Sequence, residues 1–145
     1  MYEAPIEDYK FVIDHVIGLD QLMANTGHDD ISTDLVEAVL SEAGKLAADV
    51  IAPLNHSGDQ AGATRHDDSS VTTPNGFANA YAAMAAGGWT SMEAREEFGG
   101  QNLPMVVTTA VNEFWQAANM AFALCHLLTQ GQISVSYTHL TLPTI

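Results

Sequence analysis

Basic side chains and cysteines are both scarce in this chain. Its 145 residues contain 4 lysines and arginines against 18 aspartates and glutamates, a formal net charge of −14. An acidic surface of this kind repels phosphate backbones and anionic lipid head groups, so nucleic acids and membrane surfaces are not expected as partners. Cys125 is the only cysteine, which excludes a disulfide within the chain and fits a reducing compartment.

The sequence also lacks the apolar segments that export or a membrane would require. Residues 1–8 have neither the basic nor the apolar region of a signal peptide. No apolar run approaches the roughly 18 residues of a membrane span. Hydrophobic residues nevertheless make up 47% of the chain, enough for a folded core. We therefore expect a cytoplasmic protein with one folded domain.

Helical periodicity dominates the first 133 residues. Apolar residues recur at helical spacing over five segments, residues 8–23, 34–52, 76–86, 104–118 and a last segment that begins at residue 119. This pattern predicts an all-α bundle of about five helices that forms one domain.

Three local signals predict where these helices begin and end. Asp34 followed by Glu37 resembles a capping box at the start of the second helix. Gly87 and Gly88 are typical of a helix C-terminus. Asn119 is a suitable N-cap, so we expect the long apolar run around it to divide into two helices there.

Three stretches lack a helical pattern. Residues 55–74 are rich in glycine, aspartate and serine and predict a loop, in which residues 71–73 would form an isolated extended piece without a sheet. Residues 96–104, which we call the knuckle, read Glu-Glu-Phe-Gly-Gly-Gln-Asn-Leu-Pro and lead into the apolar helix pair. Residues 134–145 carry no acidic residue and predict an irregular tail.

Few side chains offer chemistry. The six histidines are scattered, so no metal site is expected. Cys125 lies on an apolar helical stripe, which favours a buried packing role over that of a nucleophile. Glu96 and Glu97 adjoin a turn, which favours a solvated pair over an acid/base pair. Glu113 is expected to point outward, with a buried ion pair as the alternative. The residues alone specify a helical domain and no reaction.

Several short motifs together resemble the N-terminal helical domain of the FAD-dependent acyl-CoA dehydrogenases. The resemblance covers residues 1–132, and its motifs lie at residues 2–5, 48–55, 58–59, 71–74, 87–89, 98–104 and 119–122. The Tyr-Glu-Ala-Pro opening and the Val-Thr-Thr-Pro segment resemble the 3-methylmercaptopropionyl-CoA dehydrogenase-like branch of this family.

The resemblance implies a parent enzyme of three domains with FAD bound between them. Its reaction removes a proton and a hydride from an acyl-CoA, either 3-methylmercaptopropionyl-CoA or a fatty acyl-CoA, and forms an enoyl-CoA. In the family the base is a glutamate in a domain that this chain lacks. No catalytic residue is therefore assigned, and the chain alone is expected to be inactive and not to bind FAD tightly. An electron-transfer acceptor and a homo-oligomeric state are expected of the parent.

The resemblance also implies that this domain forms one wall of the acyl pocket. Matching without gaps from the Phe-Gly-Gly motif onward places Phe122, Ala123, His126 and Gln130 where residues of the family face the acyl chain. Phe122 and His126 are bulky at these positions, which would suit a short or functionalised acyl group. From the residues alone, His126 is expected to border a cavity as a core or rim histidine rather than to act in catalysis.

The end of the chain departs from this family. Residues 135–144 look like the translation of a sequencing-adapter read-through, so residues 134–145 are expected to be a non-native tail on a truncated reading frame. The alternative function is a free-standing helical interaction module without catalytic activity. A large exposed apolar face would favour the interpretation as a dehydrogenase fragment, because in the parent enzyme the missing domains would cover such a face.

Overall fold

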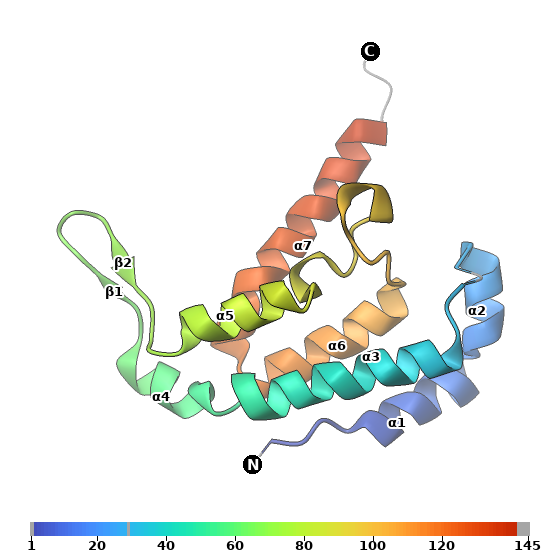
Figure 1. The fold of residues 1–145 in the computed structure, drawn as a ribbon, viewed down its shortest axis with the longest axis horizontal. Coiled ribbons are helices and arrows are strands. Elements are labelled where there is room, and N and C mark those ends of the chain that lie inside the picture. Colours follow the sequence, from blue (N-terminus) through green and yellow to red (C-terminus); the bar gives the residue numbers. More distant parts are fainter. Residues whose placement is uncertain (1, 29, 142–145) are drawn as a thin grey trace.

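The structure, a computed structural model, describes residues 2–28 and 30–141 and confirms the all-α expectation (Figure 1). In chain order the α-helices of this part are α1 Ile6–Phe11, α2 Leu19–Thr26, α3 Thr33–Leu46, α4 Leu54–Ala61, α5 Phe77–Ala86, α6 Met105–Ala118 and α7 Met120–Thr141. The strands are β1 Thr64–Arg65 and β2 Val71–Thr72. Shorter helical segments are the π-helical Val12–Ile17 and Ala47–Ile51 and the 3₁₀ turns Trp89–Ser91 and Glu96–Phe98.

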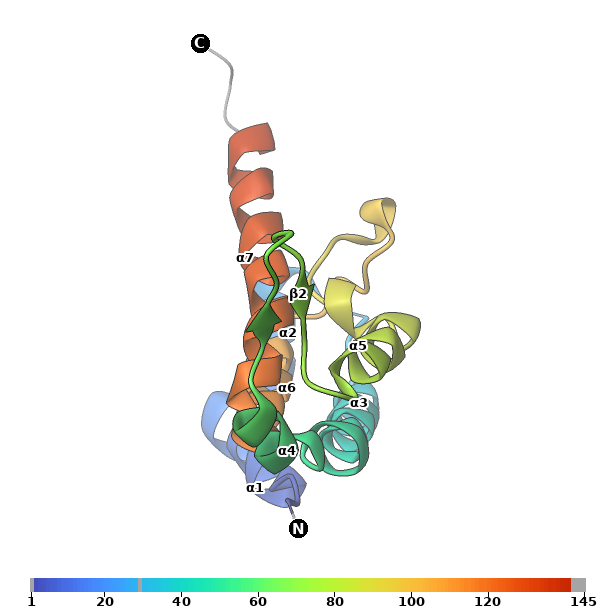
Figure 2. The same cartoon turned by 90° about the vertical axis from the view of Figure 1, so that its left-hand side faces the viewer.

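Helix α6 lies at the centre of the core. It packs against α3 and against α7, which turns back along it. Its Phe114 and Trp115 are among the largest fully buried side chains, together with Leu40 of α3. The turned view shows α7 standing along one side of the molecule, with α3 and α5 on the other (Figure 2). Helix α4 also packs against α7.

Side chains of α1 contact both α3 and α6. Lys10 Nζ of α1 lies 2.9 Å from Glu37 Oε1 of α3. The ring of Tyr9 meets that of Phe114 edge to face, with centroids 4.9 Å apart. The exposed ion pair contributes little, so burial of the aromatic pair is the larger stabilising effect.

The first expected helix is interrupted, which the apolar spacing did not predict. Gly18 adopts φ 77°, a left-handed conformation that ends one helical segment and precedes α2. The expected capping box at Asp34 is also wrong. Ser32 is the N-cap of α3, and its Oγ accepts a hydrogen bond of 3.2 Å from the backbone N–H of Leu35.

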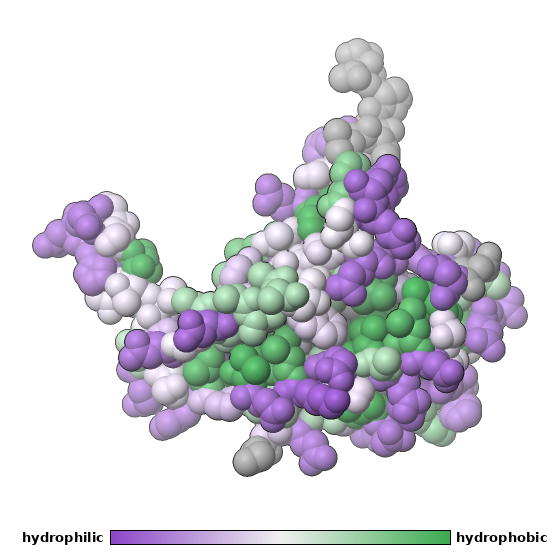
Figure 3. Space-filling model, in the orientation of Figure 1, coloured by the Kyte–Doolittle hydropathy of each residue, from purple (hydrophilic) through white to green (hydrophobic). Residues whose placement is uncertain are grey.

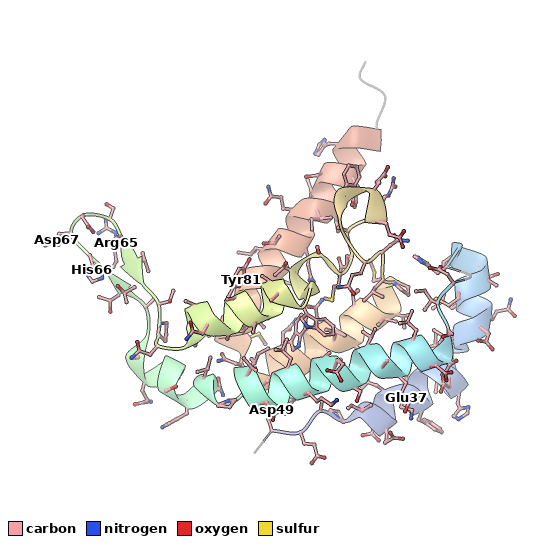
Figure 4. All side chains as sticks on the ribbon, in the orientation of Figure 1. Glu37, Asp49, Arg65, His66, Asp67 and Tyr81 are labelled. Atoms are coloured by element: carbon pink, nitrogen blue, oxygen red, sulfur yellow. The ribbon has the colours of Figure 1, made fainter. Side chains whose placement is uncertain are left out.

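Residues 55–74 are not the loop that their composition predicts. Helix α4 occupies the first part, and Gly58 within it is buried because the ring of Phe77 lies where a Cβ would be, at 2.8 Å. The expected isolated extended piece is paired as well. Strand β2 lies antiparallel to β1, with Thr64 opposite Thr72. The hairpin extends away from the helices and carries Arg65, His66 and Asp67 (Figure 4).

The predicted division of the apolar run at Asn119 is confirmed. Asn119 is extended, with φ −163° and ψ 94°, and separates α6 from α7. Its Oδ1 accepts a hydrogen bond of 3.1 Å from the backbone N–H of Phe122. The side chain is only 1% exposed, so the cap is formed in the core rather than at the surface.

The expectation of an irregular tail is wrong for residues 134–141, which continue α7 to Thr141. The hydroxyls of Ser136 and Thr138 donate to backbone carbonyls four residues earlier, at 2.8 and 3.1 Å, so these side chains are accommodated within the helix. Residues 142–145 of the expected tail lie outside the part of the chain that the structure describes.

Tyr137 gives this end of α7 a tertiary contact with the knuckle. Its hydroxyl accepts a hydrogen bond of 2.8 Å from the backbone N–H of Arg95. The guanidinium of Arg95 lies over the same ring, 5.0 Å from its centroid, and the Phe98 ring lies 5.7 Å away. Contacts over such a sequence distance explain why local periodicity did not reveal this helical end.

A substitution at Gly100 tests whether the knuckle is as closely packed as the structure shows. A Cβ added at Gly100 would overlap the backbone carbonyl of Ala94, which also accepts a hydrogen bond from Asn102 N–H. We expect Gly100→Ala to lower the free energy of unfolding by roughly 1–3 kcal/mol, because backbone must move to admit the methyl group. Gly131→Ala is the control, since an added Cβ there meets nothing within 4 Å.

Urea denaturation followed by circular dichroism measures both variants. Within α7, Gly131→Ala should raise the free energy of unfolding by roughly 0.5–1 kcal/mol, because alanine has the higher helix propensity. Equal stabilities for the two variants would contradict the close packing of the knuckle.

Candidate functional site

An apolar cavity of about 550 Å³ lies beside the first turns of α7. Residues of α4, α5, α7 and the base of the hairpin line it, and none of the lining residues carries a charged side chain. The lining includes Gly58, Phe77 and Tyr81 on one side and Ala121, Phe122 and Cys125 of α7 on the other. Such a cavity suits an uncharged, mainly apolar group.

Two aromatic rings of this wall pack against each other. Phe77 and Phe122 meet edge to face, with centroids 5.4 Å apart and planes at 89°. The absent Cβ of Gly58 allows the Phe77 ring to lie against α4. Tyr81, which Figure 4 labels on α5, is exposed and also lines the cavity. Sequence reasoning did not assign Gly58, Phe77 or Tyr81 to a site, because only the folded chain brings them to the same cavity as α7.

Cys125 is not the buried packing residue that the apolar stripe predicts. Its side chain is exposed and free, and it lies in the wall of the cavity. The stripe was misread because the neighbouring Leu124 and Leu128 are exposed as well. The inward face of α7 is formed instead by residues such as Ala123 and His126.

One turn beyond Phe122, α6 and α7 share a buried polar cluster. His126 is 1% exposed and Gln130 is 3% exposed, and their spacing of four residues places them on one face of α7. Asn112 of α6 contacts both. Its Nδ2 donates to Gln130 Oε1 at 3.1 Å, and its Oδ1 lies 2.9 Å from His126 Nε2. The sequence signal that could have revealed this cluster is the polar Asn112 within the apolar run of α6.

The environment of His126 keeps its imidazole neutral. Burial lowers the pKa of His126 to about 4, because a charged imidazolium would lose its hydration there. The ring also meets Trp115 edge to face, with centroids 4.8 Å apart. His126 Nδ1, Gln130 Nε2 and Trp115 Nε1 are buried without a hydrogen-bond partner among the described residues. His126 is thus a core histidine with only one of its nitrogens satisfied.

The structure divides the four residues that were expected to face an acyl chain. Phe122 lines the cavity. Ala123 is fully buried, and His126 and Gln130 bond to α6. Of these four neighbours on α7, Phe122 therefore lies at the cavity surface and the other three lie outside its lining.

Acidic residues do not assemble a second site in the part of the chain that the structure describes. No group of three or more histidine, cysteine or acidic residues in this part could hold a metal ion. Glu96, Glu97 and Glu113 are all exposed, as expected for solvated carboxylates. None of the helices in the described ranges is both long and apolar enough to cross a membrane.

Comparison with known proteins points to the class that the motifs predict, the acyl-CoA dehydrogenases. No family model matches the chain. Over 132 residues, however, the chain is 39% identical to 3-methylmercaptopropionyl-CoA dehydrogenase of Ruegeria pomeroyi. The match covers 91% of this chain and 22% of that enzyme, so the chain spans about a fifth of the length of this relative. The sequence resemblance is thereby confirmed, whereas the activity of a whole enzyme goes beyond this match.

His126 predicts how the stability of the domain depends on pH. Its folded pKa of about 4 lies below the ordinary value of 6.5, so between these pH values the unfolded state takes up a proton that the folded state excludes. The free energy of unfolding should therefore fall as the pH drops from 6.5 to 4, by roughly 3 kcal/mol at most from this group. Above pH 6.5 this group contributes no slope.

Urea titrations at pH 7, 5.5 and 4.5 measure this dependence in the wild type, His126→Gln and His56→Gln. His126→Gln should flatten the fall, because the titrating group is gone. His56 is exposed, so the same change there provides the matched control and should leave the fall unchanged. An identical pH dependence in all three proteins would contradict the burial of a neutral His126.

Proposed function

We propose that this chain is the N-terminal part of a FAD-dependent acyl-CoA dehydrogenase and forms one wall of its acyl pocket. The observation that carries the proposal is the 39% identity over 132 residues to 3-methylmercaptopropionyl-CoA dehydrogenase. The uncharged cavity at Phe122 supports it, because the acyl position inferred from the motifs coincides with an apolar opening of about 550 Å³. The substrate class is an acyl-CoA, either 3-methylmercaptopropionyl-CoA or a fatty acyl-CoA.

Within this proposal the cavity holds the acyl chain by burial. Each methylene group removed from water contributes about 0.8 kcal/mol, so a closed apolar wall favours a chain that fills it. Phe122 contacts the chain and, with Phe77, limits the depth of the wall. Ala123, His126 and Gln130 follow on α7 and are buried, and the bonds of His126 and Gln130 to α6 hold the helix that carries Phe122 in place.

The residues of this chain do not fit FAD as a binding site of their own. The pyrophosphate of FAD needs basic side chains or a glycine-rich cradle, and the chain has four basic residues against 18 acidic ones. Lys10, Lys45 and Arg95 each lie in an ion pair with a glutamate. We therefore assign the flavin and the catalytic base to the rest of the parent enzyme, and no step of the reaction to these residues.

The exposed apolar side chains support the interpretation that this chain is part of a larger protein. Large hydrophobic residues of this kind occur on several elements, among them Phe11, Val16, Phe98, Met105 and Leu128. Figure 3 shows apolar residues gathered on one face, between α3 and α5 and again beside α2. Extensive apolar surface of this sort is normally covered by a further domain or a partner. The alternative function, a free-standing interaction module, would use the same surface for another protein.

Long-read sequencing across the codons for residues 130–145 would first establish the reading frame of the complete enzyme. The proposal is then tested in that enzyme. Phe122→Ala removes the bulk that limits the cavity. We expect it to raise kcat/KM for longer acyl-CoA substrates relative to shorter ones about ten-fold, because about two further methylene groups could be buried.

Leu124→Ala is the matched control, since Leu124 lies on the same helix, is exposed and is outside the lining of the cavity. It should leave the chain-length preference unchanged. An unchanged preference in Phe122→Ala would contradict the proposed wall. A reading frame that stops after residue 145 would favour the interaction module.

A further inference from the structure

Asn112 links two of the four candidate site residues through a single carboxamide. On α6 it is half-buried, and it reaches two successive turns of α7. Its amide nitrogen Nδ2 donates to Gln130 Oε1 at 3.1 Å. Its oxygen Oδ1 lies 2.9 Å from His126 Nε2. Both polar capacities of the Asn112 side chain are thus directed at α7.

This arrangement determines which nitrogen of His126 carries the proton. The carboxamide oxygen of Asn112 has no hydrogen, so the contact with His126 is a hydrogen bond only if Nε2 donates. A neutral imidazole has one N–H, and the other nitrogen then offers a lone pair. Nδ1 of His126 is therefore the acceptor, and it has no partner among the described residues.

The ring cannot readily turn to exchange these two nitrogens. Trp115 follows Asn112 on the same face of α6 and meets the imidazole edge to face, with planes at 76°. Trp115 is itself held by Trp89, with centroids 5.5 Å apart. Trp115 thus fixes the plane of the His126 ring, and Asn112 fixes which ring nitrogen points toward α6.

We propose that Asn112 is a positioning residue that holds His126 as the neutral imidazole protonated at Nε2 and fixes the carboxamide of Gln130 beside it. The inference concerns hydrogen bonds within this chain and does not depend on the proposed function. Its chemical consequence is specific. The remaining nitrogen of His126 can pair with an N–H or O–H donor but not with a carbonyl or thioether, which are acceptors only.

The opposite arrangement has a distinct signature. If the amides of Asn112 and Gln130 were both reversed, Gln130 Nε2 would donate to Asn112 Oδ1 and Asn112 Nδ2 would donate to His126 Nε2. The imidazole proton would then lie on Nδ1. The position of one proton therefore distinguishes the two networks.

Nitrogen-15 NMR of the imidazole rings in the 145-residue chain at neutral pH measures this position directly. We expect a pyrrole-type signal for Nε2 of His126 and a pyridine-type signal for Nδ1. Asn112→Asp retains an oxygen acceptor, so Nε2 should stay protonated. Asn112→Leu removes both hydrogen bonds at similar volume, so the preference for one tautomer should be lost. Gln116→Leu, one turn further along α6, is the control and should leave the signals unchanged.

Two results would overturn the proposal. A pyridine-type Nε2 in the wild type would show the reversed network, and Asn112→Asp would then move the proton to Nε2. A tautomer preserved in Asn112→Leu would show that Asn112 does not set it. If Asn112→Leu does not fold, the wild type and Asn112→Asp still decide between the two networks.

Discussion

The hydrogen bond from the backbone N–H of Phe122 to Asn119 Oδ1 is the interaction on which this fold depends. Without a break, the apolar sequence from Met105 onward would favour one long helix that could not bury both of its faces. The extended backbone of Asn119 interrupts it, and the side chain replaces a missing helical partner at the start of α7. Because Asn119 is buried, water does not readily replace its side chain as an acceptor. Removing the cap would therefore leave the backbone N–H of Phe122 unsatisfied in the core.

The turn at Asn119 places successive turns of α7 against different neighbours. The turn that carries His126 packs on α6, where Asn112, Trp115 and His126 form a buried cluster that fixes the relative position of the two helices. The preceding turn carries Phe122, which closes an apolar cavity with Phe77. The polar cluster adjoins the cavity wall without lining it, so polar side chains at the proposed acyl positions can coexist with an apolar opening.

Local signals predicted those parts of the fold that depend on neighbouring residues. Helical periodicity placed the main helices, and the N-cap chemistry of Asn119 placed the turn. Helix α4 was missed because its stability comes from a tertiary contact, the Phe77 ring against Gly58, that composition does not record. The end of α7 was missed for a similar reason, since Tyr137 meets Arg95 across a long stretch of chain.

The candidate site was predictable only in part. Resemblance to a family identified a segment of α7, and the structure shows that Phe122 lies at a cavity while His126 and Gln130 bond to α6. Periodicity could not make this distinction, because residues four apart share one face of a helix but differ in what covers each turn. The apolar stripe likewise could not show that Cys125 is exposed.

Amide hydrogen exchange at Phe122, compared between the wild type and Asn119→Ala, tests the central role of the cap most directly. The account predicts strong protection of this amide in the wild type and weaker protection in Asn119→Ala, while the protection of amides within α6 is unchanged. A cap of this kind contributes about 1 kcal/mol, which corresponds to roughly five-fold faster exchange or more. Equal exchange of the Phe122 amide in the two proteins would contradict the claim that Asn119 holds the turn between α6 and α7.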